Sequence, residues 1–97
     1  MKRDKVIAAL KALAPALHSR FGVKRLSLFG SHARDEAAEG SDIDVLVEFE
    51  GPATFDAYMQ LKFHLEDALG CSVDLVTDKA VRRELRPYIE EDAIRVA

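Results

Sequence analysis

The chain has 97 residues, a net charge of −3, and 48% hydrophobic beside 32% charged residues. It is long enough for one compact core, which predicts a single domain over residues 1–97 and excludes two. The acidic balance argues against a protein built to bind a nucleic-acid backbone, so no direct nucleic-acid partner is expected.

The N-terminal segment does not have the pattern of a secretion signal. Basic residues open it, but Asp4, Lys5 and Lys11 interrupt the apolar run that a signal core needs. No stretch approaches the roughly 20 apolar residues of a membrane span, and the one cysteine, Cys71, cannot form an internal disulfide. We therefore expect a cytoplasmic protein without a membrane partner.

The first predicted elements are a helix and a strand. Apolar residues recur at helical spacing from Asp4 to about Arg20, with Asp4 as a candidate cap and Gly22 as the terminator. Pro15 is expected to bend this helix or to separate its last turn. Alternating residues from Val23 to Phe29 then predict a strand.

The next segment surrounds two short motifs. A Gly30-Ser31 turn is followed by a predicted short helix over residues 32–38 and a loop over 39–41. Asp42 to Glu50 is rich in Ile, Val and Phe and predicts the second strand, which the breaker Gly51-Pro52 ends.

The remaining elements follow with short links. Thr54 is placed to cap a helix over Phe55 to Leu69, which Gly70 closes, and Ser72 to Thr77 predicts a third strand. Asp78 is expected to cap a last helix from Lys79 to Arg86. Pro87 either ends that helix or opens a final turn, and residues 94–96 predict a short edge strand.

This order predicts an α/β fold, a small mixed sheet with helices packed mainly on one face. The short link between the first two strands is also compatible with a right-handed parallel crossover, and both arrangements stay open at this point.

Acidic residues stand out on the second predicted strand. Asp42 and Asp44 point to the same side, with Cβ atoms about 6–7 Å apart. At an effective dielectric near 20, two such charges repel by about 2–3 kcal/mol. A bound cation would remove that cost, and Mg²⁺ prefers carboxylate oxygens.

Asp74 interrupts the apolar third strand, where aspartate is disfavoured by propensity and burial. If that strand neighbours the second, three carboxylates meet in a site able to hold two metal ions. The plain alternative is solvation, which explains most aspartates on exposed strand faces. The combination with the preceding turn favours a functional site.

Gly30 and Ser31 are typical of a phosphate-binding turn. Glycine allows a ligand to approach the backbone, and Ser31 begins a helix whose free N–H groups face the same point. Arg34, one turn on, could reach the same phosphates. The plain alternative is that Ser31 only caps the helix.

The spacing of these motifs resembles the nucleotidyltransferase superfamily signature: Gly30-Ser31, ten residues, then Asp42-x-Asp44. The segments FGSHAR and GSDIDVLV are similar to the minimal nucleotidyltransferase (MNT) branch, the MntA-like antitoxins paired with HEPN-domain toxins. The resemblance covers nearly the whole chain.

The resemblance implies a polymerase-β-like fold and Mg²⁺-dependent transfer of AMP from ATP to a tyrosine hydroxyl of a HEPN RNase toxin, which silences the toxin. Matched by position, Gly30, Ser31 and Arg34 would bind the triphosphate. The three catalytic, metal-binding carboxylates, with two Mg²⁺ ions expected, would be Asp42, Asp44 and Asp74.

Two other functions compete with this one. The chain could neutralise its toxin by binding alone, with no chemistry, or it could modify a small molecule or an RNA end. The three mutually repelling acids favour catalysis over binding alone. The acidic balance and the lack of a second domain argue against the small-molecule or RNA substrate.

Overall fold

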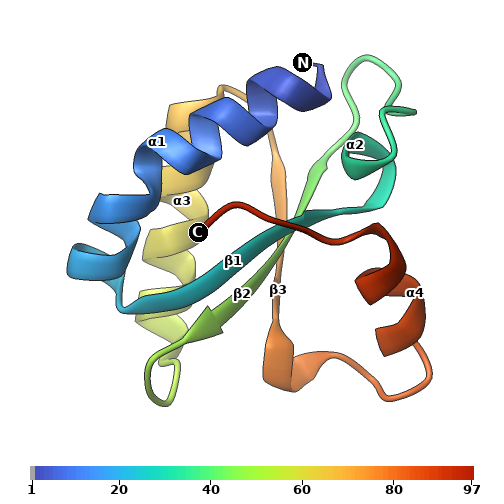
Figure 1. The fold of residues 1–97 in the computed structure, drawn as a ribbon. Coiled ribbons are helices and arrows are strands. Elements are labelled where there is room, and N and C mark those ends of the chain that lie inside the picture. Colours follow the sequence, from blue (N-terminus) through green and yellow to red (C-terminus); the bar gives the residue numbers. More distant parts are fainter. Residues whose placement is uncertain (1) are drawn as a thin grey trace.

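The computed structural model describes residues 2–97, which form a four-stranded sheet in the order β3-β2-β1-β4 (Figure 1). Met1, part of the predicted domain, lies outside the described residues. The strands are β1 (Val23–Phe29), β2 (Ile43–Phe49), β3 (Val73–Thr77) and β4 (Ile94–Arg95). Because β2 is antiparallel to β1 and parallel to β3, the sheet is mixed and the parallel crossover between the first two strands is wrong.

The two long helices, α1 (Arg3–Phe21) and α3 (Phe55–Leu69), cover the same face of the sheet (Figure 1). The prediction that Pro15 separates the last turn of α1 is wrong. Pro15 is exposed, so the carbonyl that loses its helix bond there can bind water instead. Gly22 ends α1 in the left-handed conformation, as predicted, but Lys2 rather than Asp4 occupies the N-cap position.

The ends of α3 are those that the sequence predicts. The side chain of Thr54 accepts a hydrogen bond from the N–H of Ala57 at 3.1 Å. Gly70 adopts φ 71° and its N–H donates to the carbonyl of Glu66, which closes the helix.

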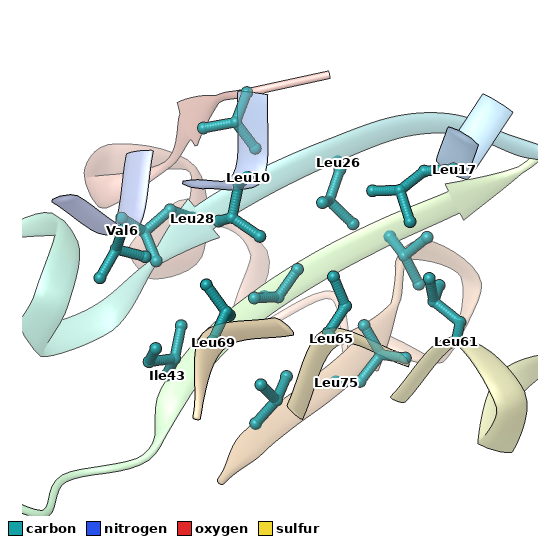
Figure 2. Packing of buried hydrophobic residues seen from close by; sticks show 14 of the residues in the cluster. Val6, Leu10, Leu17, Leu26, Leu28, Ile43, Leu61, Leu65, Leu69 and Leu75 are labelled. Atoms are coloured by element: carbon teal, nitrogen blue, oxygen red, sulfur yellow. The ribbon is translucent and has the colours of Figure 1, made fainter. Parts of the chain in front are cut away.

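A single apolar layer lies between the two helices and the sheet (Figure 2). Alternate residues of the strands point into it, and leucines of α1 and α3 fill it from the other side. Its fully buried members include Val6, Leu10, Leu17, Leu26, Leu28, Ile43, Val45, Val47, Leu61 and Leu65.

The C-terminal segment departs from the prediction of a helix over residues 79–86. A 3-10 turn, η1 (Asp78–Ala80), comes first, and the helix α4 (Arg86–Asp92) begins where Pro87 favours a first turn. The carboxylate of Asp78 does not cap a helix, because it accepts a hydrogen bond from the guanidinium of Arg86 at 2.9 Å. α4 lies against β1 and α2 (Figure 1).

Two side chains form hydrogen bonds with the backbone at the outer edge of β3. The N–H of Val73 donates to the carboxylate of Glu66 at 3.0 Å, and the hydroxyl of Tyr58 donates to the carbonyl of Leu75. Both side chains come from α3, so this helix satisfies part of the edge that no strand covers.

Across residues 2–97, none of the helices combines the length and the apolar character needed to cross a bilayer.

Candidate active site

The face of the sheet opposite α1 and α3 has two of the predicted acids side by side. Asp44 on β2 lies opposite Phe29 on β1 and opposite Asp74 on β3. The flanking residues Ile43 and Val45 point into the core, so strand alternation places the carboxylate of Asp44 on the open face. The prediction that β3 neighbours β2 and brings Asp74 to Asp44 is confirmed.

Asp44 and Asp74 are register partners on neighbouring parallel strands, so the charge of Asp74 acts on the carboxyl group of Asp44. The pKa of Asp44 is raised to about 6, first by desolvation, then by the charge and hydrogen bond of Asp74, and then by the charge of Asp42. The positive charge of Arg34 acts in the opposite direction. At neutral pH the pair is therefore an anionic site with an excess of negative charge.

Gly30 lies directly against this pair. Its φ of 74° is one that residues with a side chain rarely adopt, and a Cβ atom built there would overlap the carboxylate of Asp44. The glycine turn and the acids therefore form one site rather than two independent motifs. In the sequence, Gly30 and Asp42 are twelve residues apart.

The short helix after the turn is α2 (Gly30–Ala33), not the predicted helix over residues 32–38. Two backbone hydrogen bonds close it. The N–H of Asp35 donates to the carbonyl of His32, and the N–H of Glu36 donates to the carbonyl of Ser31. Asp35 takes the left-handed position of this motif, with φ 60°, which stops the helix. Ser31 therefore lies within the helix rather than in front of it.

Arg34 follows α2 and is held on two sides. Its Nε donates to Glu36 at 3.0 Å and its Nη1 donates to Asp92 of α4 at 2.6 Å. Both hydrogen bonds raise the pKa of Arg34. Sequence reasoning found Arg34 but missed Asp92, which is 58 positions away and has no local signal.

Asp42 has a looser position than predicted. It is exposed and precedes the first residue of β2, although its charge acts on Asp44. Within residues 2–97, no three His, Cys, Asp or Glu side chains are gathered closely enough to hold a metal ion in their present positions. The structure therefore brings Asp44, Asp74, Gly30 and Arg34 together and leaves Asp42 at the margin.

The donor set of this site fits a hard divalent cation. All its nearest acidic groups are carboxylates, and their mutual repulsion would be relieved by a positive ion. The site combines negative charge, a glycine turn in contact with Asp44 and an arginine, which together suit a metal-bound polyphosphate.

Residues 10–96 match the family model described as "Nucleotidyltransferase domain". A "Putative protein adenylyltransferase" of Methanocaldococcus jannaschii is 43% identical over 83 residues, covering 82% of this chain and 83% of its own. The "Protein adenylyltransferase MntA" of Thermococcus cleftensis is 33% identical over 93 residues, covering 96% of this chain and 94% of its own.

Solved structures agree. A "putative minimal nucleotidyltransferase" superposes with a TM-score of 0.83 at 38% identity, covering 97% of this chain and 95% of its own. A toxin–antitoxin structure with AMP-PNP (TM-score 0.71, 24% identity, 100% and 73% covered) shares the fold. So does a tri-AMPylated Shewanella oneidensis HEPN toxin in complex with MNT antitoxin (TM-score 0.68, 20% identity, 94% and 71% covered). The mixed sheet, the site at Gly30 and Asp44, and these matches lead to one conclusion: the chain belongs to the nucleotidyltransferase domain family.

Proposed function

We propose that this nucleotidyltransferase is the antitoxin of a HEPN toxin and silences it by transferring AMP from ATP to a tyrosine hydroxyl of that toxin. The observation that carries the proposal is the contact of Gly30 with Asp44, which pairs with Asp74 on the neighbouring strand. The names of the relatives and the HEPN–MNT complexes of the same fold support the choice of acceptor. Because the reaction consumes ATP, we also propose a cytoplasmic location.

The family implies a divalent metal, and Asp44 and Asp74, joined by Asp42, would hold Mg²⁺, with two ions expected. Bound there, Mg²⁺ would neutralise triphosphate charge and lower the pKa of the attacking hydroxyl. Asp42 is included because it directly precedes β2 and its charge acts on Asp44.

Residues of the turn would bind the triphosphate. Gly30 brings the turn directly against Asp44, and the first helix bond of α2 is made by the N–H of Arg34, so the preceding amides are free of helix bonds and would donate to phosphate oxygens. The hydroxyl of Ser31 and the guanidinium of Arg34 would supply further donors.

In the transfer step the acceptor oxygen forms a bond to the α-phosphorus, and the bond from that phosphorus to the bridging oxygen breaks, releasing pyrophosphate. Asp74, on the exposed side of the pair, would take the proton of the acceptor hydroxyl. The pKa of Asp44 is raised to about 6, so this carboxylate is a stronger base than an ordinary aspartate.

The proposal is tested by co-expressing the chain with a HEPN toxin from the same genome and measuring toxin mass and labelling by α-labelled ATP. We expect a mass gain in AMP units with Mg²⁺, lost with EDTA, and a loss of at least about 10³-fold in rate for Asp44→Asn. Asp67→Asn, the same change at an exposed position of α3, serves as the control.

A toxin that is bound and silenced without any mass gain would replace catalysis by neutralisation through binding alone. Peptide mapping of the modified toxin identifies the acceptor, and modification of a residue other than tyrosine would contradict that part of the proposal.

A further inference from the structure

We propose that Asp92 is a positioning residue for ATP: through its ion pair it holds Arg34 in the orientation in which the guanidinium meets the triphosphate. The inference rests on the proposed function, because it assigns a task to a residue outside the matched motifs. It starts from the 2.6 Å contact between Nη1 of Arg34 and Oδ2 of Asp92.

The two acids beside Arg34 are not equivalent. Glu36 is two residues away on an exposed turn, and 66% of its side chain is accessible. Asp92 comes from a different element, its contact is shorter, and only 21% of its side chain is accessible. A better shielded, shorter charge-assisted bond restrains the arginine more strongly, so Asp92 is the main anchor.

The backbone of Asp92 is itself fixed to the sheet. Two residues later the chain enters β4, where Ile94 pairs with Leu28 and Arg95 with Ser27. β1 then leads directly into Gly30 and α2. Arg34 follows the turn at the end of β1, and its partner Asp92 precedes β4, which pairs with β1. Both ends of the ion pair are therefore fixed to the same strand, which restrains the arginine relative to the acids.

Helix energetics do not explain an acid at this position. Glu90, Glu91 and Asp92 stand together at the C-terminal end of α4, whose last turn has no basic residue. Negative charge there is disfavoured by the helix dipole. Asp92 is compensated by a contact outside its own helix, and that contact is with Arg34.

The geometry leaves part of the guanidinium free for a ligand. Arginine has five N–H donors, of which Glu36 takes one at Nε and Asp92 takes one at Nη1. In the described part of the chain, Nη2 of Arg34 donates to no protein atom. Arg34 also acts electrostatically on Asp44, so its positive charge belongs to the same site as the acids.

The test compares Asp92→Asn with Glu91→Gln, which removes the same charge from the neighbouring, exposed position of α4. Two quantities are measured: KM and kcat for ATP in toxin modification, and the Kd of a non-hydrolysable ATP analogue with Mg²⁺ by calorimetry. For Asp92→Asn we expect KM and Kd to rise about five- to tenfold with kcat changed less than about twofold. Glu91→Gln should match the wild type, and Asp92→Glu should recover most of the affinity.

A double-mutant cycle excludes a merely structural role. In an Arg34→Ala background, Asp92→Asn should weaken analogue binding by less than about twofold, because its effect passes through the arginine. Equal losses in both backgrounds, wild-type affinity of Asp92→Asn, or tighter binding, as expected if Asp92 competes with phosphate, would each overturn the inference. Failure of the proposed function is distinguishable, because the wild type itself would then bind no nucleotide or modify no toxin.

Discussion

The two faces of the sheet are built from alternate residues of the same strands, yet they follow opposite rules. On the face covered by α1 and α3, Ile43 and Val45 are fully buried among apolar neighbours (Figure 2). On the open face, the residue between them, Asp44, faces a second aspartate and is partly desolvated. The covered face is arranged for stability, whereas the open face keeps a repulsion between acids that a bound cation would relieve.

The largest expected effect on stability lies on the covered face. Ile43→Ala should lower the free energy of unfolding by about 3 kcal/mol, because it leaves a cavity in a fully buried layer. Urea denaturation measures this loss. Leu46→Ala, half-buried on the open face of the same strand, should cost clearly less, and equal losses would contradict the distinction between the faces.

The next effect comes from the contact between the turn and the acids. Gly30→Ala should cost roughly 2–3 kcal/mol, the sum of a left-handed backbone and an overlap with Asp44. Gly22→Ala is the matched control, since Gly22 has φ 66° but nothing within 4 Å of its Cβ position, and should cost only about 1 kcal/mol. If Asp44→Ala does not reduce the cost of Gly30→Ala, the overlap is not its cause.

A gain of stability is expected from removing the charge of Asp44. Its pKa is raised from 3.8 to about 6, so the folded state binds the proton more tightly and loses stability as pH rises from about 4 to 6. With EDTA at pH 8, Asp44→Asn should stabilise the fold by roughly 1 kcal/mol, after discounting the shift for its partial exposure. The gain should disappear below about pH 4, and a gain independent of pH would contradict the electrostatic cause.

The smallest effect concerns the backbone beside Arg34. Asp35 occupies a left-handed position that glycine fills more easily, so Asp35→Gly should raise the free energy of unfolding by about 0.5–1 kcal/mol. Asp35→Asn, which removes only the charge, should change it less. If both variants behave alike in urea denaturation, charge rather than backbone conformation is responsible.

Local signals explain what the sequence could predict. The bounds of β1 and α3, the cap Thr54 and the terminators Gly22 and Gly70 were all predictable, because each depends on residues within one helical turn. Strand alternation likewise placed Asp44 and Asp74 on one face once their strands were neighbours.

What could not be predicted depends on distant contacts. The carboxylate expected to cap the last helix, that of Asp78, instead accepts a hydrogen bond from Arg86, and the helix begins later, at Arg86. The direction of β2 relative to β1 was open because the intervening link fits either pairing. Asp92 could not be identified as a site residue from the sequence around it, since its partner Arg34 lies in another part of the chain.

The hydrogen bonds of Glu66 and Tyr58 with the outer edge of β3 have a consequence for assembly. An incoming strand would have to displace both side chains before it could continue the sheet, so edge-to-edge polymerisation is blocked at this border. A partner protein that approaches this border therefore meets side chains rather than a free strand edge of β3.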